Sequence, residues 1–304
     1  SVPAFAVVTR GKEAMIVVRG TQSMADWTIN INMVPQKISY YVGKDGATCI
    51  EGVGHAGMYK GAKAIIELCG VGAIVDTLVS QGYDIKVVGH SLGAGISCMI
   101  AIQLKARFAE RKAAGERSDI PFIPSIGFGH PPCLGVNIAE AARNDRLCTA
   151  VVNQHDVVCR LSEFNFTPLA EEVFLYKDEA KKQLNEDMEC VSKYAKSLGR
   201  TERLNSNQNA EDQPSAEDEL RDPEATTPTL RRANSADREA TMRSTFDRLC
   251  IPGNIILFGT QSDGKVKAGL CPHDAKTLKR IVLVDEMVGD HDMAEYSNSM
   301  REVM

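Results

Sequence analysis

The most constraining feature of this chain of 304 residues is a glycine-rich turn between a predicted strand and a predicted helix. The pentapeptide Gly89-His90-Ser91-Leu92-Gly93 follows the apolar run 84–88 and precedes a small-residue helix that starts near Ala94. A G-x-S-x-G sequence in this context is typical of a nucleophile elbow, in which a sharp turn lifts the serine hydroxyl above a sheet. Ser91 is therefore the candidate nucleophile, and the alternative is a strand–helix turn without chemistry.

Strand-like and helix-like segments alternate through the first 190 residues. Apolar runs predict strands at 4–8, 14–19, 37–42, 84–88, 122–129 and 147–153, and helical patterns fall at 55–81, 94–114, 136–143 and 169–197. Runs that are apolar throughout suit strands buried on both faces. Their alternation with helices favours a mostly parallel sheet covered by helices, and we expect the first strands to form an antiparallel edge.

The composition changes sharply in the second half of the chain. Neither Val nor Ile occurs between Val191 and Ile251, and the segment 199–246 consists mainly of charged and small polar residues. Such a segment buries too little apolar surface to offset its ordering entropy, so we expect disorder there. Strands at 253–258 and 279–284 and a helix at 291–303 follow. We interpret residues 1–304 as one α/β domain interrupted by a polar insert.

Composition narrows the possible functions. A net charge of −5 without a basic stripe argues against nucleic-acid binding. Nine cysteines without C-x-x-C pairs argue against a zinc site or a disulfide framework, and favour reduced thiols in an intracellular compartment. No run of 18 apolar residues occurs, so we expect no membrane span. The chain begins in strand-like sequence without a signal peptide, which we interpret as a domain of a longer protein, with any membrane anchor upstream.

A serine nucleophile needs an imidazole base, which follows it in the order Ser, Asp or Glu, His. His291 lies in the sequence 289–292, after the predicted strand 279–284 and ahead of the last helix, where a base is expected. His273, before that strand, is the main alternative.

The base in turn needs a carboxylate that holds its tautomer. Asp156 follows the predicted strand 147–153 at its carboxyl end, where such an acid belongs. The alternative is that Asp156 caps a turn, and Asp145 and Asp178 are weaker candidates for the acid.

Two donors must stabilise the oxyanion. The backbone N–H of Leu92, directly after the nucleophile, is one candidate. Thr21 is the other, because the turn Arg19-Gly20-Thr21 ends an early predicted strand and offers both an amide and a hydroxyl. The alternative for that turn is an ordinary β-turn.

Together these motifs resemble the class 3 lipases. The family pattern is an R-G-T strand end (19–21), an H-x-G segment (55–57) and G-H-S-L-G (89–93), in this order. Asp156-Val157-Val158 with Arg160, and Asp290-His291 with Tyr296, resemble the acid and base segments of the family.

Within the family, three features resemble the sn-1-specific diacylglycerol lipases. These are Ala94-Gly95 after the elbow, the pair Pro131-Pro132, and the long polar insert. The pair Asp26-Trp27 is more similar to class 3 lipases in general, and the four-helix membrane domain of the diacylglycerol lipases is absent from this sequence.

The resemblance implies an α/β-hydrolase fold and hydrolysis of a glycerolipid acyl ester through an acyl-enzyme, most simply diacylglycerol to monoacylglycerol and fatty acid. It implies no metal or organic cofactor, and a substrate reached at the cytoplasmic face of a membrane. The alternatives are a phospholipase A1, a triacylglycerol lipase, or a lipase-like binding module without catalysis.

Two further segments bear on access and regulation. Met24, Trp27, Ile29 and Ile31 follow the R-G-T turn, and we expect them in a lid or acyl groove, with core packing as the equal alternative. In the insert, Ser235 follows Arg232 as in basophilic kinase sites, and Thr227-Pro228 matches proline-directed kinases. We expect a kinase to act there and the insert to cover the mouth of the active site.

Overall fold

The computed structural model describes residues 2–20, 35–162, 165, 249–272, 275–278, 281 and 284–304. The chain divides into two units, and all described residues lie in the first, which comprises Ser1–Leu169 and Ser244–Met304. The second unit, Ala170–Arg243, lies outside the description, as do the helix predicted at 169–197 and the insert at 199–246.

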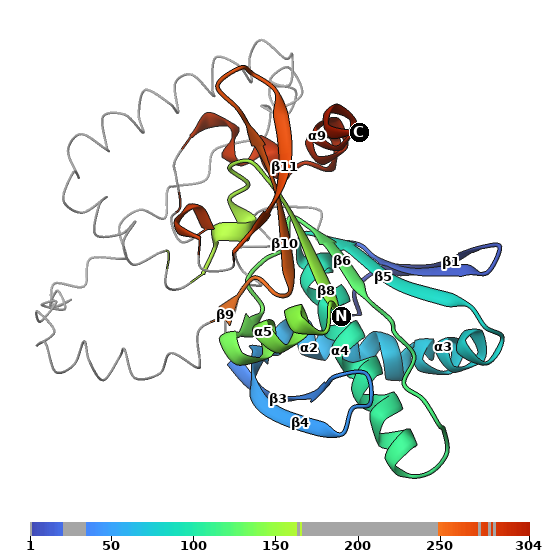
Figure 1. Ribbon diagram of the computed structural model, residues 1–304. Helices are drawn as coiled ribbons and strands as arrows, with labels where there is room; N and C mark the ends of the chain where they lie inside the picture. The colour runs from blue at the N-terminus through green and yellow to red at the C-terminus, as the bar shows by residue number, and fades with distance from the viewer. Residues whose placement is uncertain are drawn as a thin grey trace, which may run out of the picture. The chain divides into compact units, whose positions relative to one another are not determined.

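A sheet of seven strands forms the centre of the first unit (Figure 1). Its spatial order is β1 (Phe5–Arg10), β2 (Glu13–Val18), β5 (Asp84–His90), β6 (Ser125–Phe128), β8 (Cys148–Asn153), β10 (Asn254–Thr260) and β11 (Val266–Cys271). The strands β2, β5, β6, β8 and β10 pair in parallel, whereas β1 and β11 pair antiparallel at the two edges. The predictions of a mostly parallel sheet and of an antiparallel first edge are confirmed.

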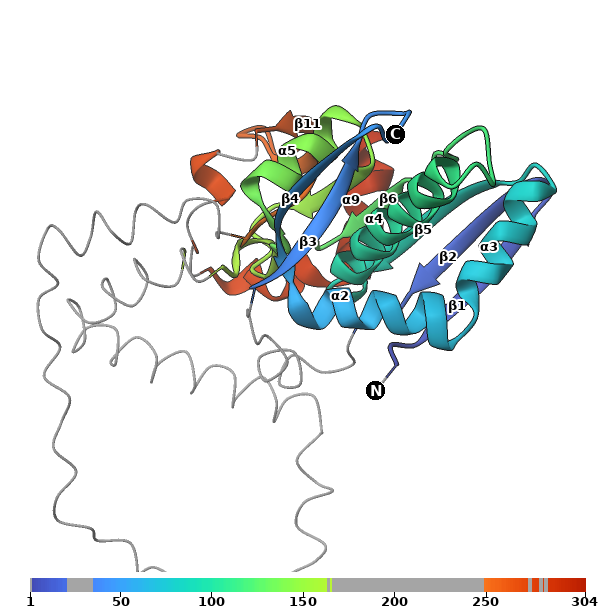
Figure 2. The same ribbon diagram turned by 90° about the horizontal axis from the view of Figure 1, so that it is seen from below.

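Helices cover both faces of this sheet (Figure 2). On one face lies α4 (Leu92–Ala113), with α2 (Ala56–Lys63), the π-helix η1 (Ala64–Leu68) and α3 (Val71–Ser80). Cys148 of β8 is buried in the core beneath α4, while Val151 packs with Tyr296 of α9 (Met293–Val303). Because odd and even positions of a strand point to opposite faces, α9 covers the face opposite α4.

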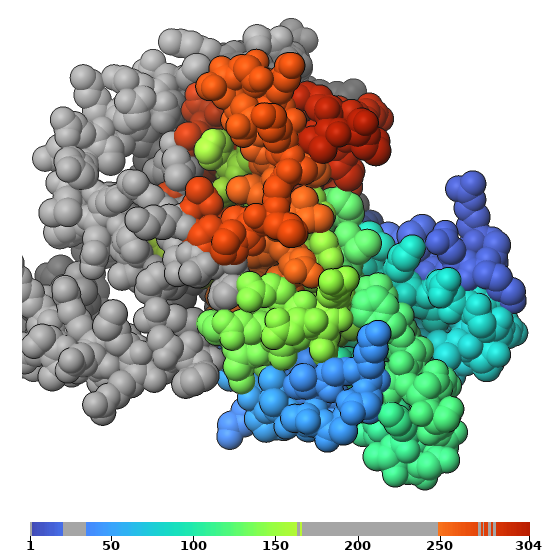
Figure 3. Space-filling model, viewed as in Figure 1, coloured from blue at the N-terminus to red at the C-terminus, as the bar shows by residue number. Residues whose placement is uncertain are grey.

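A second sheet of four strands, in the order β3-β4-β7-β9, lies beside the α4 face. It contains β3 (Pro35–Val42), β4 (Thr48–His55), β7 (Leu134–Gly135) and β9 (Leu249–Cys250). Figure 3 shows the β3–β4 hairpin (blue) against α5 (Val136–Asn144, yellow-green), which agrees with the contacts of α5 with both strands.

The helix α4 is apolar because it is the core helix of the unit. Over the described residues it is the one helix long and apolar enough to cross a membrane, but 78% of its apolar window is buried inside the protein. Its buried side chains include Ile96, Met99 and Phe108, which pack against both sheets. Burial in the core of this unit accounts for its composition.

Several predicted boundaries differ from the structure. The helix expected over 55–81 is broken at Gly70, whose φ of 73° interrupts the helical backbone. The strands β4, β7, β9 and β11 were not expected. The strand predicted at 279–284 lies mostly outside the described residues, and Ile281 and Val284, which are described, belong to no strand. Among the described residues, β11 is the last strand in chain order. Ile281 is buried against Val157 and Val158. An apolar run therefore indicates that residues are buried, but it does not identify their backbone conformation.

Candidate active site

Ser91 stands in a sharp turn between β5 and α4. Its backbone angles are φ 57° and ψ −131°, a region that residues other than glycine rarely adopt. The turn is held by Ser91 N–H, which donates to the carbonyl of Phe128 on the neighbouring strand at 2.9 Å. Such strain persists only where the surrounding structure enforces it, and it is common at active sites.

The glycines around Ser91 allow the backbone to pass this closely. A Cβ on Gly89 would lie 2.1 Å from the carbonyl oxygen of Gly93, and one on Gly93 would lie 2.4 Å from that of Val18. A Cβ on Gly20 would lie 2.7 Å from His90 O and 3.1 Å from Ser91 Cβ. The end of β2 and the segment after it therefore approach the serine directly.

Asp156 and His291, which are 135 residues apart in the chain, form a buried pair. His291 Nδ1 lies 3.0 Å from Asp156 Oδ2 and 3.1 Å from Oδ1. Asp156 is completely buried and His291 is 7% exposed. Because a carboxylate oxygen accepts, Nδ1 carries the proton, which leaves Nε2 as the basic nitrogen of the neutral ring.

Two further groups donate to the Asp156 carboxylate. The hydroxyl of Tyr296 donates to Oδ2 at 2.6 Å, and the backbone N–H of Val158 donates to Oδ1 at 2.8 Å. Burial, then the negative charges nearby, raise the pKa of Tyr296 well above its usual value, so the hydroxyl remains a donor. Three donors compensate for the loss of hydration of this buried carboxylate.

Arg160 holds the turn that carries the carboxylate. This side chain, 3% exposed, lies in the 3-10 helix η2 (Val158–Arg160). Its guanidinium donates to the backbone carbonyls of Asp156 and Gln154, both at 2.7 Å, and to that of Thr277 at 2.9 Å. Gln154 has a positive φ of 35°, which marks the sharp turn after β8. Arg160 thus ties the turn after β8 to Thr277, in a segment that precedes His291.

His291 lies in the 3-10 helix η6 (Gly289–His291), directly against the elbow. The ring of His90 lies 4.6 Å from the His291 ring, centroid to centroid, and His90 Nε2 donates to His291 O at 2.8 Å. Burial and the positive charge that His291 can carry both lower the pKa of His90. His90 therefore stays neutral beside His291, and its hydrogen bond links η6 to the turn that carries Ser91.

Gly129, just after β6, lies directly against the Asp156–His291 pair. A Cβ there would lie 2.7 Å from His291 Cε1, 2.8 Å from Nδ1 and 3.0 Å from Asp156 Oδ2. Its φ of 59° also favours glycine. Sequence reasoning missed this residue, although a glycine at the end of a predicted strand is a signal for close approach of a neighbouring group.

The structure brings Asp156 and His291 together beside the Ser91 elbow. It does not bring Asp145 there, because that carboxylate lies before β8, at the opposite end of the strand. The other proposed site residues lie outside the described residues: Thr21, Met24, Trp27, Ile29, Ile31, Asp178, Thr227, Ser235 and His273.

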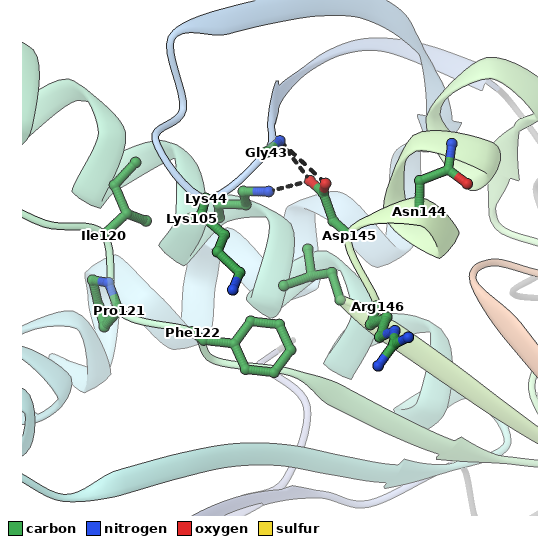
Figure 4. Close-up of a pocket in the computed structure, with 10 residues that line it drawn as sticks. Gly43, Lys44, Lys105, Ile120, Pro121, Phe122, Asn144, Asp145 and Arg146 are labelled. Carbon is green, nitrogen blue, oxygen red and sulfur yellow. Dashed lines mark hydrogen bonds and ion pairs between the residues drawn. The ribbon is translucent and has the colours of Figure 1, made fainter.

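A cavity of about 580 Å³ lies at that opposite end of the sheet (Figure 4). Residues 120–122 and 144–147, which line it, precede β6 and β8, whereas the elbow, Gly129 and Asp156 follow strand ends. In its wall, Asp145 accepts from Lys105, from Tyr40 and from the Gly43 amide. The cavity is therefore separate from the candidate active site.

The described strand order, the parallel centre, the elbow after β5 and the acid after β8 define an α/β hydrolase. The family model for lipase (class 3) matches residues 15–166, half of the chain. The chain therefore belongs to the class 3 lipases, a family of carboxylic ester hydrolases. The match contains Ser91 and Asp156, whereas His291 lies beyond it.

Curated relatives cover parts of the chain. It is 29% identical over 109 residues to the secreted mono- and diacylglycerol lipase 2 of Gibberella zeae, a match over 32% of this chain and 27% of that protein. It is 24% identical over 169 residues to the diacylglycerol lipase-beta of Mus musculus, over 55% of this chain and 23% of that protein. The chain thus spans about a quarter of the length of these relatives.

Among solved structures, the chain is similar to the triacylglyceride lipase of Rhizomucor miehei, with 22% identity and a TM-score of 0.39 over 52% of this chain and 55% of that one. It is also similar to the LIP2 lipase of Yarrowia lipolytica, with 21% identity and a TM-score of 0.37 over 48% and 52%.

Proposed function

We propose that this chain is the catalytic domain of a serine lipase that hydrolyses an acyl ester of a glycerolipid, with diacylglycerol as the substrate and monoacylglycerol and fatty acid as the products. Residues 1–304 form one α/β-hydrolase domain in this proposal, and 199–246 are an insert within it. The observation that carries it is the buried Asp156–His291 hydrogen bond directly beside a strained serine elbow.

The proposed reaction follows from the proton positions. Asp156 holds the proton of His291 on Nδ1, so Nε2 removes the proton of Ser91 Oγ as the hydroxyl attacks the ester carbonyl. The imidazolium then protonates the leaving glyceride oxygen, which leaves an acyl-enzyme. His291 next activates a water molecule, which releases the fatty acid and restores the serine. The buried, triply hydrogen-bonded Asp156 stabilises the imidazolium in both steps.

The oxyanion in this mechanism is stabilised by the amides of Leu92 and Thr21. Leu92 is the first residue of α4, a helix of 22 residues whose amino end favours negative charge. Thr21 directly follows Gly20, whose close approach to Ser91 supports a donor from that side. Neither donor requires a metal ion or an organic cofactor.

The glycerolipid substrate is proposed from the relatives. Both are named as lipases of diacylglycerol, and one also of monoacylglycerol. An ester of this kind resides in a lipid layer, so the enzyme works at a membrane surface, which we place on the cytoplasmic side. The names of the relatives favour diacylglycerol over triacylglycerol and phospholipid.

The first experiment tests the chemistry. A fluorophosphonate probe should label the wild type, and labelling and fatty-acid release from diacylglycerol should both disappear in Ser91→Ala. His291→Ala should lose at least about 1,000-fold in kcat, while the matched variant His273→Ala should retain activity. Loss of activity in His273→Ala but not in His291→Ala would assign the role of base to His273 instead. Absence of labelling in a folded wild type would indicate a binding module without catalysis.

The second experiment tests the substrate. Diacylglycerol, triacylglycerol and a phospholipid are presented in the same mixed micelles, and kcat/KM is compared. We expect the highest value for diacylglycerol. A higher value for phospholipid would instead identify a phospholipase A1.

Access to the site is proposed to depend on two segments. The residues Met24, Trp27, Ile29 and Ile31 form a lid or acyl groove, so the fluorescence of Trp27, the single tryptophan, should shift when micelles bind. The insert covers the active-site mouth and is a target for kinases at Thr227 and Ser235. Deletion of 200–245 should therefore raise kcat, and unchanged turnover would contradict a covering role.

A further inference from the structure

A second cluster of reactive side chains lies in the core, away from the catalytic pair. Cys98 on α4 and His130 and Cys133 on the segment after β6 place one donor atom each within 4.8 Å of one another. All three residues are buried, with exposures of 0%, 1% and 0%. Within the described part of the chain, this is the one group of three or more such residues with donor atoms this close.

The imidazole of His130 is held in the tautomer that a metal ligand needs. Its Nδ1 lies 2.8 Å from the carbonyl oxygen of Pro131, which can only accept, so Nδ1 carries the proton. Nε2 therefore presents a lone pair, and it has no hydrogen-bond partner among the described residues. A carbonyl that accepts from the second ring nitrogen is the usual support of a metal-bound histidine. A buried acceptor without a partner is otherwise unfavourable.

We propose that Cys98, His130 and Cys133 bind a thiophilic d10 cation. Zinc(II) fits this site because the two thiolates neutralise its charge. Tetrahedral bonds of about 2.3 Å to sulfur and 2.0 Å to nitrogen hold donors about 3.5–3.8 Å apart, so donors that lie within 4.8 Å of one another need to close by about 1 Å at most. The three residues supply three of the four ligands that structural zinc takes. A further sulfur, Cys148 Sγ, lies 3.3 Å from Cys98 Sγ.

Charge and protons balance in this site. Burial raises the pKa of both Cys98 and Cys133, so without a metal ion the two thiols are neutral. Zinc(II) displaces one proton from each thiol to solvent, and the complex with two thiolates and one neutral imidazole has no net charge. A neutral complex suits a fully buried position, where an unpaired charge is costly.

The position of the site suggests its role. Cys98 lies on the helix that begins directly after Ser91, and His130 directly follows Gly129, which supports His291 and Asp156. A metal ion here links the elbow helix to the segment beneath the catalytic pair, so it acts as a structural tie. The pattern His130-x-x-Cys133 has ligand spacing, but the partner cysteine lies 32 residues earlier in the chain, so a search for C-x-x-C pairs misses it.

Metal content tests the proposal. The purified chain, dialysed without chelator, should hold about one zinc ion per chain by elemental mass spectrometry. Cys98→Ala and Cys133→Ala should reduce it to background. The matched control is Cys250→Ala, because its thiol donates to the Leu134 carbonyl nearby and lies outside the donor group; it should retain the ion. If the protein instead contained one copper(I) ion per chain, the metal site would be supported and copper(I), also a d10 ion, would be identified as its occupant.

Two readouts on the wild type decide the question if the variants fail to fold. Cobalt(II) added to chelator-stripped protein should give thiolate-to-metal charge-transfer absorption. Zinc(II) should raise the Tm of the stripped protein by about 5–10 °C, as expected for an ion at 100 times its Kd. Wild type that contains no metal, and that shows neither the cobalt band nor the Tm shift, would overturn the proposal. Retention of the metal by both cysteine variants would overturn it as well.

Discussion

Gly129→Ala tests whether the position of the proposed catalytic pair, Asp156 and His291, depends on Gly129, because the variant retains both reactive side chains. The new Cβ would lie 2.7 Å from His291 Cε1, whereas ordinary contact begins at 3.4 Å, so the ring must retreat by about 0.7 Å. That shift stretches the 3.0 Å bond to Asp156 beyond hydrogen-bond range and moves Nε2 relative to Ser91. Displacements of this size cost about 100-fold in rate. We therefore expect kcat and the rate of fluorophosphonate labelling to fall about 100-fold.

The matched control is Gly11→Ala. Gly11 has the same φ of 59°, but a Cβ there meets nothing within 4 Å. Both variants pay about 1–2 kcal/mol for a side chain at positive φ, which lowers Tm by roughly 2–8 °C. Only Gly129→Ala should also lose activity. Equal kcat in the two variants, measured well below both Tm values, would refute the contact argument.

Three further predictions concern other parts of the molecule. Asp156→Asn should lower kcat by about 10,000-fold because an amide stabilises the wrong tautomer of the base, and a loss below 10-fold in an ester assay would contradict this. Lys105→Met leaves the carboxylate of Asp145 without its cation, in a pair whose side chains are 9% and 14% exposed, so urea unfolding should show a loss of about 3 kcal/mol. Burial lowers the pKa of His55 below its usual 6.5, so below that pH the unfolded state binds more protons than the folded state. The free energy of unfolding should therefore decrease as the pH falls below 6.5. In His55→Asn, that part of the plot of stability against pH should be flatter.

The sequence predicts best those features whose signals are local. The elbow is contiguous, and glycines on both sides of Ser91 report the crowding that the structure displays. The parallel centre of the sheet follows from strands that are apolar throughout, since both faces are covered. Asp156 could be selected as a candidate because a strand end is visible in the sequence.

Other features depend on contacts between distant segments. The strand β4 is mixed in character and only partly buried, so it has no clear apolar period. Ile281, in the apolar run at 281–284, packs against the turn after Asp156 without belonging to a strand, and the sequence alone cannot distinguish the two cases. Gly129 and Arg160 contact distant segments, namely the ring of His291 and the carbonyl of Thr277, and the sequence does not show which segment each of them meets.

The separation of acid and base along the chain has a consequence for proteolysis. A cut anywhere between 166 and 248 would produce an amino-terminal piece with Ser91 and Asp156 and a carboxyl-terminal piece with His291. In the proposed mechanism, neither piece alone contains the full set of groups for ester hydrolysis. Their reassembly would rest on the parallel pairing of β8 with β10 and on the packing of Tyr296 of α9 against Val151 and Phe258 of these strands. The architecture thus makes the enzyme a candidate for fragment complementation, in which activity reports that two separately produced fragments have associated.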